Sequence, residues 1–220
     1  MTGARQRAGS RPGWGFIAGN TLALAAATAV ASMALWPVYQ SVEFLILVAV
    51  TFALGAAIAI LGALFRWPAW VVALAAALAY LFAGVPLAIP GRAIERFLPT
   101  PDGMVELLGA TALSWKQLVT IVLPVGAYQS LLVPAFILVL LSTVIGLSAA
   151  LRARFGEFGV LAPIALFLGG IALGPAVESS PIEAGLGLFA VVVFWLLGLH
   201  WQRRRTAVRF VAQQSRRTLE

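Results

Sequence analysis

The chain has 220 residues, of which 61% are hydrophobic and only 10% are charged. A soluble domain carries roughly 25% charged residues, and one core of this size cannot hide so much apolar surface. The composition therefore excludes a soluble fold and predicts an integral membrane protein. No cysteine is present, and His200 is the single histidine, so we expect no disulfide, thiolate nucleophile, metal site or cofactor.

Six apolar segments are long enough to cross the roughly 30 Å hydrocarbon core of a bilayer as helices. The first is too long, and too polar at Asn20 and Thr21, for a signal-peptide core. The segments lie at approximately 16–35, 44–64, 70–89, 131–151, 160–177 and 186–201. The predicted fold is all-α and polytopic: six transmembrane helices within residues 16–201, between a basic N-terminus (1–15) and a basic tail (202–220).

The basic residues predict the orientation of these helices. If the N-terminus is cytoplasmic, the cytoplasmic segments hold all the Lys and Arg residues except Arg92, Arg96 and Lys116, whereas most acidic residues lie outside. This is the positive-inside pattern, and it predicts an N-in, C-in topology. The net charge of +7 then reflects topology and attraction to anionic lipid. We expect the lipid bilayer as a partner and no nucleic acid.

Aromatic residues fall near the predicted membrane borders, where amphipathic rings prefer to lie. They are Trp14, Trp36, Tyr39, Trp67, Trp70, Trp115, Tyr128 and Trp201.

Residues 90–130 form one long extracytoplasmic loop between the third and fourth helices. Its first part is rich in proline and glycine, which predicts irregular structure, and Asp102 is the expected helix N-cap. The residues that follow predict an amphipathic helix lying in the membrane interface. One face holds Met104, Leu107 or Leu108, Thr111, Trp115, Leu118 and Val122, and the opposite face holds Glu106, Ala110, Ser114 and Gln117. The stretch "PVGAYQS", from Pro124, then turns the chain into the fourth helix.

This loop also holds the candidate docking residues for a following domain or an envelope protein. They are Arg92, Glu95, Arg96, Trp115, Lys116, Tyr128 and Gln129. The alternative is a simple solvated loop, because its positive and negative charges cancel.

Two glycine pairs and one amide are candidates for helix packing. Gly15 with Gly19, and Gly170 with Gly174, fit the small-xxx-small pattern of close helix contacts. Packing within the chain, dimerisation and a broken helix at a transport site are the alternatives. Asn20 is expected to hydrogen-bond a neighbouring helix, worth on the order of 1 kcal/mol, with a ligand role as the alternative. The predicted helix centres lack charged residues, which argues against a proton-coupled transporter.

Three stretches carry a family resemblance: "GVPLAIPGRAIERFLPTPDG", "LSWKQLVTIVLPVGAYQSLLVPAFILVLLSTVIGLSAALRAR" and "LAPIALFLGGIALGP". Over approximately residues 20–205 the chain resembles the N-terminal membrane domain of bacterial, actinobacterial-type TgpA-like transglutaminase-like membrane proteins. In that family an extracytoplasmic domain with a Cys-His-Asp triad follows the membrane domain. No catalytic residue carries over, because this chain lacks cysteine. The resemblance implies the membrane part alone, with a truncated tail.

The resemblance also implies a location and a role. We expect a non-catalytic domain in the bacterial inner (plasma) membrane that anchors and orients an extracytoplasmic transglutaminase-like domain. Two alternatives stay open. One is a small multi-pass transporter or lipid-handling protein, and the other is a scaffold subunit of a cell-envelope assembly complex.

Overall fold

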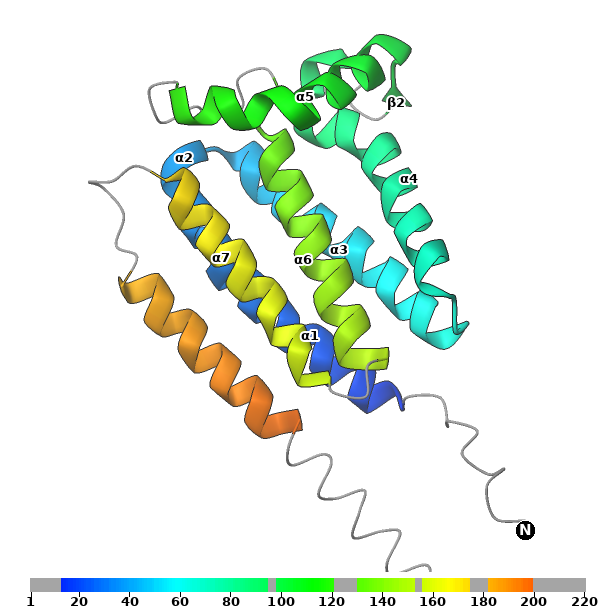
Figure 1. Ribbon diagram of the computed structural model, residues 1–220, viewed down its shortest axis with the longest axis vertical. Coiled ribbons are helices and arrows are strands. Elements are labelled where there is room, and N and C mark those ends of the chain that lie inside the picture. The colour runs from blue at the N-terminus through cyan, green and yellow to red at the C-terminus, as the bar shows by residue number, and fades with distance from the viewer. Residues whose placement is uncertain (1–12, 95–97, 121–129, 153–155, 175–181, 200–220) are drawn as a thin grey trace, which may run out of the picture.

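The six predicted apolar segments all form helices in the computed structural model (Figure 1), which describes residues 13–94, 98–120, 130–152, 156–174 and 182–199. Six helices in this part of the chain are long and apolar enough to cross a membrane. They span Trp14–Tyr39, Val42–Leu64 (α3), Ala69–Ala88 (α4), Val133–Arg152 (α6), Gly156–Leu173 and Ile182–Leu199. The prediction of an all-α, multi-pass membrane protein is therefore confirmed.

The first of these spans is not one regular helix. It consists of α1 (Trp14–Ser32), a 3-10 turn (Met33–Leu35) and a short α2 (Trp36–Tyr39). Pro37 is the cause, because its ring removes one backbone N–H and clashes with the carbonyl group of the preceding turn. Tyr39, which the sequence placed near the membrane border, is fully buried within the protein at the end of α2. Its hydroxyl donates to the Leu131 carbonyl at 3.0 Å, which removes the cost of burying it.

The fifth predicted span ends earlier than the sequence predicted. A 3-10 turn at Gly156–Val160 leads into α7 (Leu161–Leu173), so the fifth span ends four residues before the predicted limit. Gly174 is extended, with φ −78° and ψ 161°. It precedes Pro175, and a residue before proline disfavours helix. The described part of the sixth span, Ile182–Leu199, already includes residues before the predicted start at 186.

The helix at the centre of the bundle is α6, which packs against α1, α3, α4, α5 and α7. Most of its residues are buried. Its close approach to α3 depends on Gly55, because a Cβ atom there would lie 2.9 Å from the Cβ of Thr143. Such small-residue contacts are how membrane helices pack when lipid is as apolar as their own side chains.

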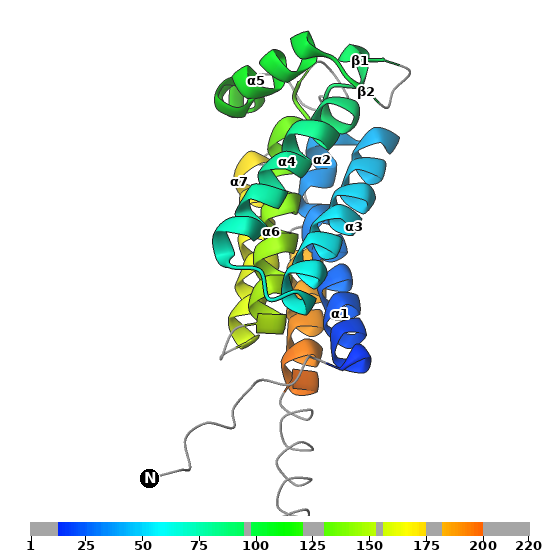
Figure 2. The same cartoon turned by 90° about the vertical axis from the view of Figure 1, so that its right-hand side faces the viewer.

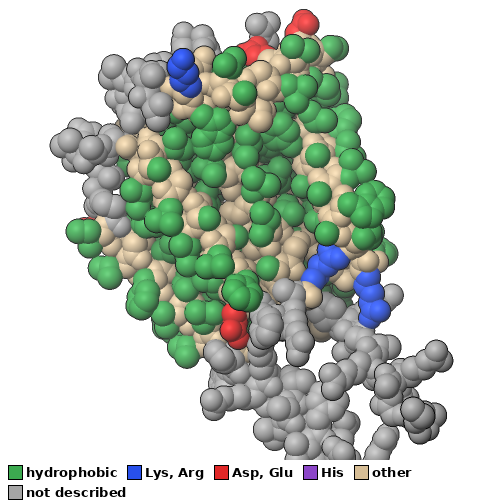
Figure 3. Space-filling model, viewed as in Figure 1, with side chains coloured by type: hydrophobic (Ala, Val, Ile, Leu, Met, Phe, Trp, Pro, Cys, Tyr) green, Lys and Arg blue, Asp and Glu red, His purple; other side chains and the backbone are tan. Residues whose placement is uncertain are grey.

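One more helix, α5 (Pro101–Thr120), lies across one end of the bundle beside a two-residue antiparallel pair, β1 (Ala93–Ile94) and β2 (Leu98–Pro99) (Figures 1 and 2). The start of α1 and the end of Ile182–Leu199 both lie at the opposite end. Hydrophobic side chains cover the flank of the bundle seen in Figure 3, and the charged side chains lie toward its ends.

The N-cap of α5 differs from the predicted one. The Thr100 hydroxyl, not the Asp102 carboxylate, accepts the Gly103 backbone N–H at 3.0 Å. Pro101 begins the helix, as its fixed φ and missing N–H favour at the first helical position. Asp102 therefore lies in the first turn, where a negative charge is favourable beside the helix N-terminus.

Candidate functional site

The candidate site is the end of the bundle that α5 covers, and it begins with the residues that hold α5 in place. Leu107, Ala110, Ser114 and Leu118 form a buried stripe toward α4 and α6. The sequence assigned Leu118 and either Leu107 or Leu108 to one face, and the structure selects Leu107. It placed Ala110 and Ser114 on the opposite face, which is wrong. The side chains of Ala110 and Ser114 are small enough to let α5 approach the bundle. The Ser114 hydroxyl donates to the Ala110 carbonyl, so its burial leaves no unpaired polar group.

A hydroxyl pair joins α5 to α4. The oxygens of Tyr80 and Thr111 are 2.5 Å apart, and the Thr111 hydroxyl also lies 2.9 Å from the Leu107 carbonyl. The Tyr80 ring packs against Phe136 of α6, with centroids 5.7 Å apart. Sequence reasoning missed Tyr80. The feature that could have identified it is a lone tyrosine within an apolar segment, because a buried tyrosine hydroxyl needs a hydrogen-bond partner.

A close backbone approach supports the same contact. A Cβ atom on Gly84 of α4 would lie 2.8 Å from Cδ2 of Leu107. Leu107 therefore fills the space that the missing side chain leaves. Together with the hydroxyl pair, this contact fixes the position of α5 along α4.

The other side of α5 is exposed, and we call it the outer α5 surface. It consists of Asp102, Val105, Leu108, Leu113 and Lys116. The exposed fractions are 72% for Val105, 57% for Leu108 and 61% for Leu113. Exposed apolar groups of this size at the end of a membrane bundle are typical of contact with a partner or with the bilayer interface.

Two of the seven predicted docking residues have described side chains. Trp115 is half-buried, and its indole N–H donates to the Thr111 carbonyl at 2.9 Å, so that donor is already used within α5. Lys116 is exposed on the outer α5 surface. Arg92 is the last residue of the 3-10 turn Pro90–Arg92. The structure describes its backbone but not its side chain. The remaining four, Glu95, Arg96, Tyr128 and Gln129, lie outside the described residues.

The predicted amide contact of Asn20 is present. Its side chain is buried, its Nδ2 donates to the Phe16 carbonyl at 2.8 Å, and its Oδ1 accepts the Trp195 indole N–H at 2.9 Å. This bond joins α1 to the helix Ile182–Leu199, as expected for a buried amide between membrane helices. Asn20 is therefore a packing residue whose two polar atoms are both used.

The two glycine pairs differ. Gly170 of α7 packs tightly on the first span, because a Cβ atom there would lie 2.8 Å from the Cβ of Ala34. Gly174 ends α7. Gly15 and Gly19 are exposed, and a Cβ atom on Gly15 would meet nothing within 4 Å in the described structure. The close contact predicted at Gly15 is thus missing among the described residues.

In the described part of the chain, no three His, Cys, Asp or Glu side chains gather as metal ligands would. Comparisons with protein-family models, with curated proteins and with solved structures found no match for this chain.

Proposed function

We propose that this chain is a non-catalytic membrane domain of the bacterial plasma membrane that anchors and orients an extracytoplasmic transglutaminase-like domain at the outer α5 surface. One observation carries the proposal. A helix fixed across the end of a six-helix bundle presents Val105, Leu108 and Leu113 outward, at 57–72% exposure. The positive-inside distribution of arginine supports the extracytoplasmic side for this end.

The composition of the outer α5 surface supports a protein partner. Its apolar side chains lie between an acid, Asp102, and a base, Lys116, and apolar residues with a polar rim are typical of protein interfaces. Helices that only adsorb to anionic lipid are instead rich in Lys and Arg on their polar face. The polar residues of α5 include Asp102 and Glu106 against the single base Lys116.

The rigidity of α5 supports a role in orientation. The buried stripe and the Tyr80–Thr111 pair hold the helix on α4 and α6. A partner docked on such a helix takes a fixed angle to the bundle, because a site on a rigid element is more precise than one on a loop.

Site-directed photo-cross-linking tests this proposal. A photoreactive side chain at Val105, in the cells that produce the protein, is expected to cross-link to peptides of a transglutaminase-like domain, identified by mass spectrometry. The control position is Leu168 of α7, which is 59% exposed on the flank of the bundle and should cross-link to lipid. Lipid adducts alone at Val105, or the same protein adducts at both positions, would contradict the proposal.

A further inference from the structure

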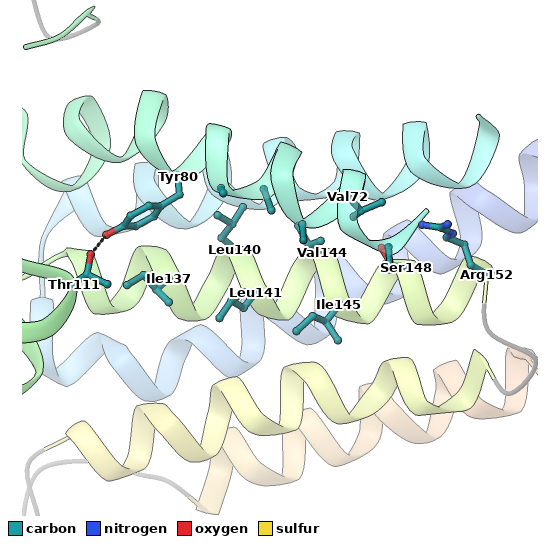
Figure 4. Close-up of a pocket in the computed structure, with 14 residues that line it drawn as sticks. Val72, Tyr80, Thr111, Ile137, Leu140, Leu141, Val144, Ile145, Ser148 and Arg152 are labelled. Atoms are coloured by element: carbon teal, nitrogen blue, oxygen red, sulfur yellow. Dashed lines mark hydrogen bonds between the residues drawn. The ribbon is translucent and has the colours of Figure 1, made fainter. Parts of the chain in front are cut away.

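A groove of about 630 Å³ runs along the flank of the bundle between α4 and α6 (Figure 4). It exists because α4 contributes small side chains, Ala69, Ala73, Ala76 and Ala77, opposite the larger branched residues of α6. Alanine leaves a slot where a leucine would reach across to the next helix. The groove is thus a consequence of the alanine-rich sequence of α4.

The groove has a buried floor and an exposed rim. Ala76 and Val144 lie in the floor and are at most 9% exposed. Ala77 and Ile145 lie on the rim and are exposed. The groove therefore opens sideways, toward the lipid that surrounds a membrane-spanning bundle.

The groove follows most of the length of the α6 span. Its lining runs from Ala69 to Tyr80 on α4, about 16 Å at the helical rise, and from Ile137 to Arg152 on α6, about 22 Å. One leaflet is half of the roughly 30 Å hydrocarbon core, or half of the roughly 40–45 Å that includes the headgroups. The groove is therefore long enough to take one extended acyl chain whose headgroup lies at the Arg152 end.

The two ends of the groove differ in chemistry. The Tyr80–Thr111 pair closes one end beside α5. Arg152 marks the other end and is exposed. One nitrogen of its guanidinium donates to the Trp67 carbonyl, which fixes the group there, and a guanidinium has five N–H donors in all. The buried Ser148 hydroxyl, one turn earlier, has no hydrogen-bond partner within the described structure.

We propose that this groove binds an acyl chain of an anionic phospholipid from the leaflet at the Arg152 end, with the lipid phosphate paired to the Arg152 guanidinium. An apolar slot ending at a positive charge is complementary to an apolar chain ending at a phosphate. Arginine matches phosphate geometry with two parallel N–H donors. The bound lipid would fill the space between α4 and α6 and join them. This site is separate from the outer α5 surface.

Native mass spectrometry of the full chain in detergent tests the charge contact, with phosphatidylglycerol and phosphatidylcholine of identical acyl chains as probes. The wild type is expected to prefer phosphatidylglycerol. Arg152→Gln should weaken phosphatidylglycerol binding about fivefold, as the loss of one basic residue near a membrane surface implies. Phosphatidylcholine binding should change less. The control Lys116→Gln removes the same charge on α5, at the other end of the bundle, and should leave both affinities unchanged.

A second pair of variants tests the groove itself. Ala73 lines the groove and is exposed, so Ala73→Phe fills the slot without replacing a core residue. This variant should weaken the binding of both lipids at least fivefold. Leu78 is 45% exposed on α4 and does not line the groove, so Leu78→Phe should have no effect. Helix content by circular dichroism checks that each variant folds.

Three results would overturn the proposal: equal affinity of the wild type for the two lipids, equal loss in Arg152→Gln and Lys116→Gln, or unchanged lipid binding in Ala73→Phe. If the wild type is a dimer and the Ala73→Phe variant is a monomer, the groove would be assigned to a second copy of the chain instead. The two test variants, Arg152→Gln and Ala73→Phe, leave the outer α5 surface intact, so failure of the lipid proposal is distinguishable from failure of the docking proposal.

Discussion

Among the described residues, one hydrogen bond joins the side chains of the first and last spans. Asn20 and Trp195 are 175 positions apart in the chain, yet the indole N–H and the amide oxygen meet at 2.9 Å in a buried contact. Between membrane helices there is no hydrophobic driving force from water, so packing and such polar contacts hold peripheral helices in place. The helix Ile182–Leu199 has many exposed apolar residues. We therefore expect this bond to contribute substantially to holding the helix on the bundle.

We therefore predict coupling between these two residues. Asn20→Leu and Trp195→Phe should each lower the free energy of unfolding, with a coupling of about 0.6 kcal/mol and at most about 1.7 kcal/mol. Denaturant-induced unfolding in mixed micelles, arranged as a double-mutant cycle, measures this coupling. Trp70→Phe is the control, because Trp70 is 68% exposed, and it should change stability by less than about 0.5 kcal/mol. Strict additivity in the cycle would show that the bond contributes nothing.

Among the elements, α5 depends most on its contacts with others. Its buried stripe reaches α4 and α6, and most of its other described side chains are exposed or half-buried. An amphipathic helix of this kind obtains most of its stability from tertiary packing. The Tyr80–Thr111 pair and Leu107 are the contacts that place it on α4.

Removing the Tyr80 hydroxyl should therefore loosen α5 locally. Tyr80→Phe keeps the ring on Phe136 but loses a hydrogen bond worth about 0.5–1.5 kcal/mol. Hydrogen exchange followed by mass spectrometry should show severalfold faster exchange in α5, with α6 peptides around Val144 unchanged. Thr111→Val in the Tyr80→Phe background should add little further change. Faster exchange throughout the bundle would instead assign Tyr80 to the general core.

At the scale of the whole molecule, charge and hydrophobicity are separated. The flank seen in Figure 3 is apolar, and the charged side chains lie toward the ends. The described Arg66 and Arg152 belong to the segments assigned to the cytoplasm, together with the basic termini. Short cytoplasmic loops of membrane proteins carry an excess of Lys and Arg. This distribution therefore supports an N-in, C-in orientation.

Single-cysteine labelling tests this orientation, and the cysteine-free chain makes each label unambiguous. Ala112→Cys is exposed on α5, and Phe158→Cys replaces a residue that is 62% exposed in the 3-10 turn Gly156–Val160. A membrane-impermeant maleimide should label position 112 in intact spheroplasts, and position 158 only after permeabilisation. Labelling of position 158 in intact spheroplasts would reverse the topology.

The sequence by itself determined the class of the protein, the number of spans, and the presence of a separate helix near 101–120. These properties depend on hydrophobicity averaged over about 20 residues and on where charges and prolines fall. They need no knowledge of neighbouring helices. The same reasoning found Asn20, because an amide in an apolar segment needs a partner wherever the neighbouring helix lies.

Only the tertiary structure decided which side of each helix faces protein. In a membrane helix, lipid-facing and core-facing residues are equally apolar, so hydrophobic periodicity cannot separate them. For that reason the sequence missed the burial of Tyr39. Along α5, the small or polar side chains of Ala110 and Ser114 gave no apolar signal, so the sequence placed them on the wrong side of the helix. The sequence also did not predict the groove between α4 and α6, because a run of alanines forms a slot only beside the larger residues of another helix.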